Sequence, residues 1–228
     1  MRLCMFHPDV QPMERGWVGR VDGDRVLHLA AQTLQAFFLG GGGAREHAEY
    51  RLDEVTLLVP VLYPPAVRIF DGDTFAFANP AAVRGPGAQI TAPAAAEQLA
   101  VGPRVAAVIG ADGQIGGFSC YAEVRAPGLR RPKDSDFGSA LGPVVVTPDE
   151  LAAGSPKLLV RVDGEEQLRG DLGDFDWGAA RTLAASGTRL RTGDVLVSPA
   201  AGAVELEPGA DVEIEVPAIG VLTLGVSA

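Results

Sequence analysis

The sequence predicts a mainly β fold of the α+β class. Turn pairs such as Asp22-Gly23 and Asp163-Gly164 separate apolar segments, which is typical of short antiparallel hairpins. Near the C-terminus, residues 212–216 alternate valine and isoleucine with glutamate, the pattern of a strand with one buried face. Apolar residues at helical spacing are convincing only in 30–39 and 177–185. Strands should therefore outnumber helices.

The first 57 residues are expected to form a small N-terminal domain. Residues 17–29 alternate around Asp22-Gly23 and predict a hairpin. Residues 30–39 predict a helix that ends at the run 40–43, because four consecutive glycines cannot hold a helix. A phosphate loop is the alternative for this run, but no Lys-Ser or Lys-Thr follows it, and a linker is the better interpretation. Residues 55–61 predict the strand that leaves this domain.

The second domain is expected to span residues 58–228. Residues 105–109 and 117–124 predict a hairpin, and 157–162 leads into another tight turn at Asp163-Gly164. Residues 177–185 predict a helix that ends before Gly187. The Ala/Gly/Pro-rich segment 78–96 predicts a coil over the surface.

The composition excludes several partners. The chain has 19 basic and 29 acidic residues and a formal net charge of −10, which argues against nucleic acid and against an anionic membrane surface. The start lacks the apolar core of a signal peptide, and the longest apolar run, 55–67, is proline-interrupted and too short to span a bilayer. Cys4 and Cys120 show no metal-ligand spacing, so we expect buried thiols and a cytoplasmic protein.

The most informative motif begins at Lys133. Asp136 follows three residues later, then Leu141-Gly142-Pro143 and, after a short apolar stretch, Thr147-Pro148-Asp149-Glu150-Leu151. This motif resembles a signature of the fumarylacetoacetate hydrolase family. Further segments resemble the family in the same order, namely 86–90, 105–110, 162–167, 190–196 and 217–222. The resemblance implies the family's twisted mixed-β roll with a small N-terminal domain, usually a homodimer, and a small carboxylate as ligand.

The resemblance also implies where a divalent cation would bind. Family enzymes hold Mg²⁺ or Mn²⁺ with a Glu-x-Glu on one strand, whose side chains share a face, and an Asp on the next strand. Counting back from Val108-Ile109-Gly110 places the first two ligands at Gly102 and Arg104, and the third falls at Glu123. Glu123 would be the only retained ligand position, so no metal is expected. If the register over 97–104 is shifted, Glu97 could replace one ligand; an exposed loop carboxylate is the preferred alternative.

Other family positions are also altered. The family's lid, with its His and Glu, should follow the strand at 67–70, but Asp71-Gly72-Asp73 stands there, and the family's Thr-Gly-Thr-Pro becomes a segment beginning at Ser198. A later family Lys is replaced by Asn79. Lys133 and Asp136 are the vestigial catalytic candidates, and the substrate-binding candidates are Arg104, Gln167 and Ser198. The alternative is that Lys133 is an exposed loop residue and Asp136 caps a turn.

Two further patterns favour ordinary structure. Asp71 and Asp73 could hold a cation, but Asp-Gly-Asp is also a common turn, which we favour. His47 and Glu49 resemble the His and Glu of the family's lid, but they do not follow the strand at 67–70. A solvated polar segment is therefore expected.

Three functions remain open. The first is a family member without metal and without the usual hydrolase activity that acts as a binding or structural protein. The second is an active metal-dependent hydrolase, isomerase or decarboxylase of 2-oxo or β-diketo acids, and the third is metal-free chemistry in the same cavity. For the first, we predict that Arg104 and Glu123 face the same cavity and form an ion pair; the alternative is an Arg104 that points into solvent.

Overall fold

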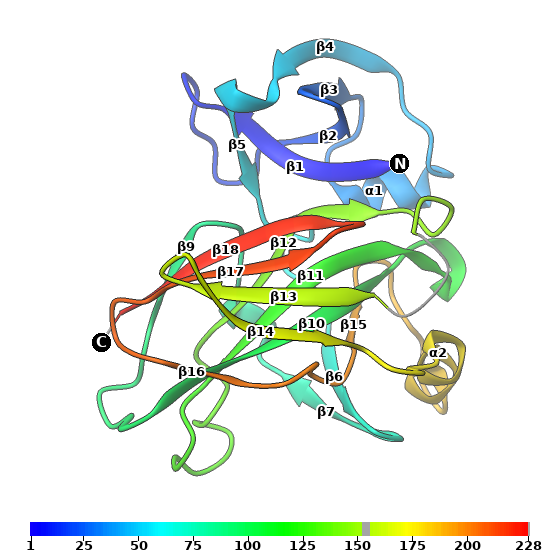
Figure 1. Ribbon diagram of the computed structural model, residues 1–228. Coiled ribbons are helices and arrows are strands. Elements are labelled where there is room, and N and C mark those ends of the chain that lie inside the picture. Colours follow the sequence, from blue (N-terminus) through cyan, green and yellow to red (C-terminus); the bar gives the residue numbers. More distant parts are fainter. Residues whose placement is uncertain (152–155, 228) are drawn as a thin grey trace.

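The computed structural model of the chain describes residues 1–151 and 156–227, which form two β-sheets and two short α-helices (Figure 1). The larger sheet has thirteen strands: β1 (Arg2–Pro8), β2 (Trp17–Asp22), β3 (Arg25–Leu29), β4 (Glu46–Arg51), β5 (Val55–Leu58), β6 (Val67–Asp71), β7 (Thr74–Ala78), β8 (Val83–Arg84), β10 (Leu99–Ile109), β11 (Ile115–Arg125), β12 (Ser139–Val146), β15 (Val195–Val197) and β16 (Val204–Leu206). The smaller sheet contains β9 (Ala88–Thr91), β13 (Lys157–Val162), β14 (Glu165–Asp171), β17 (Asp211–Val216) and β18 (Gly220–Ser227). The helices are α1 (Leu34–Leu39) and α2 (Trp177–Ala185), and short 3₁₀ turns lie at Leu52–Glu54, Pro80–Ala82 and Ala111–Gly113.

The pairing confirms a mainly β fold with mixed sheets. The main path of the larger sheet runs β4-β3-β2-β1-β12-β11-β10-β15-β6-β7, and the smaller sheet runs β14-β13-β17-β18-β9. Most neighbours are antiparallel, while β8 on β12, β15 on β6 and β9 on β18 are parallel. Among the described residues, no helix is long and apolar enough to cross a membrane.

The N-terminal strands continue the larger sheet. The predicted hairpin is present as β2 and β3, and the strand from Val55 is present as β5. β1 pairs with β12, with Leu3 opposite Val145, so the first 57 residues share a hydrogen-bonded sheet with the rest (Figure 1). The division into domains 1–57 and 58–228 stays a prediction.

The first helix begins later than the sequence predicts. Residues 30–33 lie outside α1, because the Thr33 hydroxyl accepts a hydrogen bond from the Ala36 backbone N–H at 3.1 Å and caps the helix there. The end at Gly40 is as predicted. Only the last six residues of the apolar segment are helical, so its apolar spacing alone overstates the helix.

The expectation of a coil over 78–96 is wrong in part. β8 and β9 lie within this segment, and β9 runs beside β18, with Ile90 opposite Val226. Ile90 is buried in the core, which explains why this stretch is ordered as a strand. Its Ala/Gly/Pro composition conceals the strand, because the partner strand lies at the other end of the sequence.

Strand β10 crosses the middle of the molecule with both faces buried. Val105, Ala107 and Ile109 join a core cluster that also contains the inward face of β17, whereas Ala106 and Val108 join a second cluster with the apolar residues of α1. Because side chains alternate along a strand, positions 102 and 104 share the face of Ala106 and Val108. The long hairpin of β10 and β11 therefore places position 104 inside the protein.

Candidate functional site

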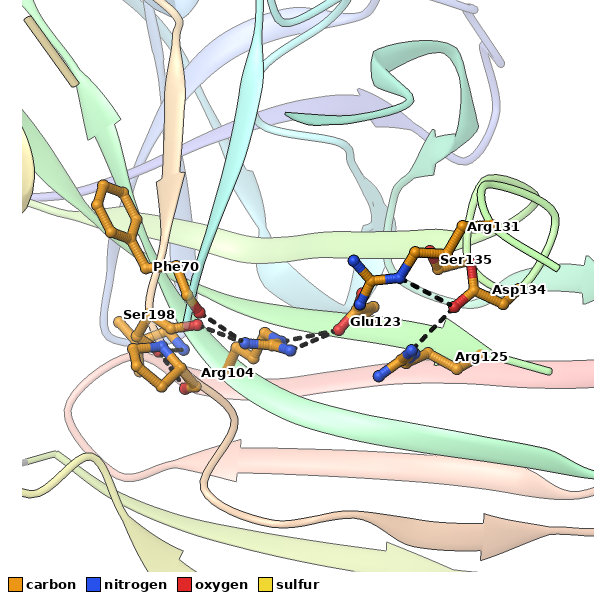
Figure 2. A network of polar contacts seen from close by, with 10 residues as sticks. Phe70, Arg104, Glu123, Arg125, Arg131, Asp134, Ser135 and Ser198 are labelled. Carbon is orange, nitrogen blue, oxygen red and sulfur yellow. Dashed lines mark hydrogen bonds and ion pairs between the residues drawn. The ribbon is translucent and has the colours of Figure 1, made fainter. Parts of the chain in front are cut away.

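An ion pair joins Arg104 of β10 to Glu123 of β11, as the sequence predicts (Figure 2). In the β10–β11 register, Gly102 lies opposite Glu123 and Arg104 lies opposite Tyr121, so the two charged residues are diagonal neighbours on one face. Nη2 and Nε of Arg104 donate to Oε2 of Glu123 at 2.6 and 3.1 Å. Their side chains are only 11% and 9% exposed, so the alternative of a solvent-directed Arg104 is wrong.

The remaining terminal nitrogen of Arg104 contacts backbone oxygens. Nη1 donates to the Ser198 carbonyl at 2.7 Å and lies 3.5 Å from the Phe70 carbonyl (Figure 2). Ser198 is itself fixed to β10, because its hydroxyl accepts from the Val105 N–H and its own N–H donates to the Val105 carbonyl. Every nitrogen of the guanidinium therefore donates to a protein oxygen. The site consists of residues from β6, β10, β11 and the segment after β15.

A second buried ion pair, which the sequence did not predict, joins β6 to the residue that precedes β15. Arg68 of β6 donates through Nη1 to Oδ2 of Asp194 at 3.0 Å, and both side chains are buried. The same carboxylate oxygen accepts from the Arg191 N–H, and the guanidinium lies over the ring of Phe77 at 5.3 Å. Asp194 belongs to a segment that resembles the family, but its partner lies 126 residues away in the chain, a pairing that one sequence does not reveal.

Asp134 forms a third cluster beside the first. Its carboxylate accepts from Arg125 at 2.9 Å and lies 3.9 Å from Nε of Arg131, and the Asp134 side chain is buried (Figure 2). Sequence reasoning assigns no role to Asp134, although it lies inside the motif. Figure 2 shows this cluster on the far side of Glu123 from Arg104, so basic and acidic groups alternate across the region.

Lys133 and Asp136 contact each other in the loop before β12. Lys133 Nζ lies 2.8 Å from Asp136 Oδ2, and the Lys133 side chain is 73% exposed. The Asp136 carbonyl accepts from the Asn79 amide at 2.9 Å, while the Asp136 N–H closes a turn onto the Pro132 carbonyl. These contacts agree with the alternative of an exposed lysine and a turn aspartate. A catalytic role for either residue stays a prediction.

The structure does not bring the other candidates to this site. Gln167 is exposed on β14, an outer strand of the smaller sheet, and Glu97 is exposed before β10. Asp71 ends β6 and Asp73 lies in the tight turn between β6 and β7, as favoured from the sequence. His47 and Glu49 lie exposed on β4.

The comparisons with known proteins identify a domain in the second half of the chain. Residues 120–227 match the model described as fumarylacetoacetate (FAA) hydrolase C-terminal. These residues form a C-terminal domain of the fumarylacetoacetate hydrolase family. A search of curated proteins found no match to the sequence.

Several solved structures share the fold along the whole chain. Fumarylacetoacetate hydrolase from Exiguobacterium antarcticum is 22% identical, with a TM-score of 0.84 and coverage of 100% of this chain and 99% of that chain. 5-carboxymethyl-2-hydroxymuconate delta-isomerase from Mycobacterium smegmatis is 23% identical, with a TM-score of 0.80 and the same coverage. Maleylpyruvate hydrolase from Sphingobium sp. SYK-6, solved with manganese(II) and pyruvate, is 18% identical, with a TM-score of 0.78 and the same coverage. These likenesses concern the fold.

The three positions that the family resemblance assigns to the cation, 102, 104 and 123, hold one carboxylate. Gly102 has no side chain, Arg104 carries a permanent positive charge, and Oε2 of Glu123 is paired with that charge. Within residues 1–151 and 156–227, no group of three or more His, Cys, Asp or Glu residues is placed to hold a metal ion. Mg²⁺ and Mn²⁺ need several oxygen ligands, which this arrangement does not supply.

The two thiols are not nucleophiles of this site. Cys4 and Cys120 are buried and unlinked, as expected from the sequence. Burial raises the pKa of both thiols to about 12, since the apolar surroundings disfavour the thiolate. Both sulfur atoms therefore remain protonated near neutral pH.

Proposed function

We propose that this family member works without the divalent cation and without the family's usual hydrolase activity, as a binding or structural protein. The observation that supports this proposal is the buried contact of Arg104 with Glu123. The guanidinium places one positive charge beside the carboxylate, which otherwise would be a costly unpaired buried charge.

A cation at Glu123 would compete with Arg104. If Arg104 stayed, the two positive charges would repel each other in a region of low dielectric, and if it left, it would lose its hydrogen bonds to Glu123 and Ser198. Without the cation, no Lewis acid supports polarisation of a 2-oxo group at this position. The guanidinium is a poor substitute, since each of its three nitrogens already donates to a protein oxygen.

Other properties implied by the family remain part of the proposal. We propose that the protein is a homodimer and that it is cytoplasmic. Sedimentation of the purified chain measures its oligomeric state. A small carboxylate remains a possible ligand class by resemblance. Arg104, which would bind such a ligand, already donates to Glu123, Ser198 and Phe70.

Calorimetric titration of the full chain with Mn²⁺ and Mg²⁺ tests the proposal. We expect no stoichiometric binding tighter than about millimolar, because one carboxylate is too few for these ions. Turnover of acylpyruvates is measured in the same preparations with and without a chelator. A tight stoichiometric site, or hydrolysis that the chelator abolishes, would contradict the proposal and favour the metal-dependent hydrolase, isomerase or decarboxylase instead.

A further inference from the structure

A cavity of about 510 Å³ lies between the β6–β7 turn and α2. Its apolar wall includes Phe70, Leu172, Phe175 and Leu183. Phe70 and Phe175 meet edge to face with their ring centroids 5.8 Å apart; Phe70 is buried, so the half-buried Phe175 supplies the aromatic surface that a guest can reach. A concave, largely apolar space of this size is typical of a small-molecule site.

The cavity is next to the Arg104 site but separate from it. Phe70 is one of the lining residues, and its carbonyl oxygen lies 3.5 Å from Nη1 of Arg104. Pro199, which directly follows Ser198, also lines the cavity. Gly72 and Asp73, which also line it, belong to the turn that stands where the family resemblance places the lid.

The charged groups of this cavity are carboxylates. Asp73, Asp174 and Asp176 line it, and none of its described lining residues is Lys, Arg or His. Asp176 accepts from the N–H groups of Gly178 and Ala179 at 2.7 and 3.0 Å, so its negative charge offsets the positive end of α2. Asp73 and Asp174 are exposed, which leaves their charge available at the rim. Arg181 of α2, with Arg189 and Arg191 after the helix, lines a different cavity.

We infer that this cavity binds a small organic cation, an amine with an aromatic or branched aliphatic body. The apolar part would pack on Leu172, Phe175 and Leu183, while the ammonium group would lie at the acidic rim. Aromatic faces and carboxylates both favour a cation over an anion. This inference rests on the proposed binding role, and it reverses the charge of the carboxylate ligand that the family resemblance implies.

Titration of the full chain by NMR with three matched probes tests the inference. Phenethylamine is the cation, 3-phenylpropionate the anion and 2-phenylethanol the neutral analogue, at near-neutral pH and low salt. We expect shifts of residues around α2 and the β6–β7 turn, and an affinity for the amine at least about tenfold above that for the carboxylate. Equal affinities for amine and carboxylate, or shifts elsewhere only, would overturn the inference.

Three variants locate the charge requirement. The double variant Asp73→Asn/Asp174→Asn should weaken the amine by about tenfold, since both carboxylates are exposed and their loss leaves the apolar wall intact. Leu183→Lys should weaken the amine and strengthen the carboxylate probe. The control Asp22→Asn also removes one negative charge, but it lies on β2 at the opposite end of the molecule (Figure 1), and it should leave both affinities unchanged.

The outcomes separate this inference from the metal proposal. The inference is supported if the double variant loses amine binding and the Asp22→Asn control keeps it. This outcome does not depend on the result of the Mn²⁺ titration. Amine binding that all variants retain overturns the inference. Tight Mn²⁺ binding would refute only the metal-free proposal and not the amine cavity. Phe70 is the one described residue that both lines the cavity and contacts Arg104.

Discussion

Nη2 of Arg104 lies 2.6 Å from Oε2 of Glu123, across the diagonal of two antiparallel strands in the middle of the larger sheet. A buried carboxylate without a partner is costly, and a pair with good geometry removes that cost without adding much stability over an apolar substitute. The pair should therefore be sensitive to the loss of one member and tolerant of the loss of both.

Arg104→Ala should lower the free energy of unfolding by about 2–4 kcal/mol, because it leaves Glu123 buried and uncompensated. Chemical denaturation at neutral pH measures this change. Arg45→Ala is the matched control, since Arg45 is exposed, and a surface substitution should stay within about 0.5 kcal/mol.

The double variant Arg104→Met/Glu123→Leu should recover most of the lost stability, because it removes both charges and keeps the volume. An Arg104→Ala variant that melts like the Arg45→Ala control would show that the ion pair contributes nothing.

Restoring the family's carboxylates should create a metal site. Gly102→Glu/Arg104→Glu places three carboxylates on one face of β10 and β11, with Glu123 as the third. A side chain fits at position 102, since an added Cβ would lie 3.5 Å from the Ala200 Cβ and no closer than 3.8 Å to any other atom it would meet. Mutual repulsion should destabilise the metal-free variant, and Mn²⁺ should raise its melting temperature.

The control for this design is Gly102→Gln/Arg104→Gln, which has similar shape without the charges. Calorimetry should show Mn²⁺ binding at least about tenfold tighter for the Glu variant than for the parent chain or the Gln variant. If neither variant binds Mn²⁺, positions 102, 104 and 123 do not correspond to the family's ligands.

Spacing within one hairpin could be predicted, whereas contacts between distant segments could not. Arg104 and Glu123 are 19 residues apart on strands joined by one turn, so counting from Val108-Ile109-Gly110 sufficed to pair them. The Arg68–Asp194 pair depends on the parallel contact of β6 with β15, which no local pattern specifies. β9 was missed for the same reason.

The amine cavity was also beyond sequence reasoning. Its walls come from the β6–β7 turn, the segment before α2, α2 itself and Pro199, which meet only in the folded chain. From the sequence alone, Asp174 and Asp176 cannot be distinguished from ordinary solvated turn residues. Their proposed role in binding a cation depends on the apolar and aromatic side chains that line the same cavity in the folded chain.

The buried thiols predict how the protein responds to alkali. The pKa of Cys4 and Cys120 is raised from 9.0 to about 12 by burial, so the unfolded chain loses these protons first. Their contribution to stability is complete below about pH 9 and is lost as pH rises towards 12. At about pH 8, a thiol reagent should therefore modify native protein far more slowly than protein in denaturant. Rapid modification of both thiols in the native protein would contradict their burial.

His28 should titrate below its ordinary pKa. Burial lowers the pKa of His28 from 6.5, and the nearby charge of His47 lowers it further. The ring of His28 stacks on Trp17 with centroids 4.7 Å apart and lies 5.5 Å from His47. As pH falls, the unfolded chain binds this proton before the folded chain does. The stabilising effect of neutral His28 is therefore present above pH 6.5 and is lost as pH falls through its folded pKa.

An NMR titration of the imidazole C–H signals measures the pKa of His28. The variant His47→Gln should raise this pKa, because the smaller of the two causes disappears, while burial keeps it below 6.5. His7→Gln, on β1, is the control and should leave the pKa of His28 unchanged. A His28 that titrates at or above 6.5 in the parent chain would show that the ring is more solvated than its stacking on Trp17 implies.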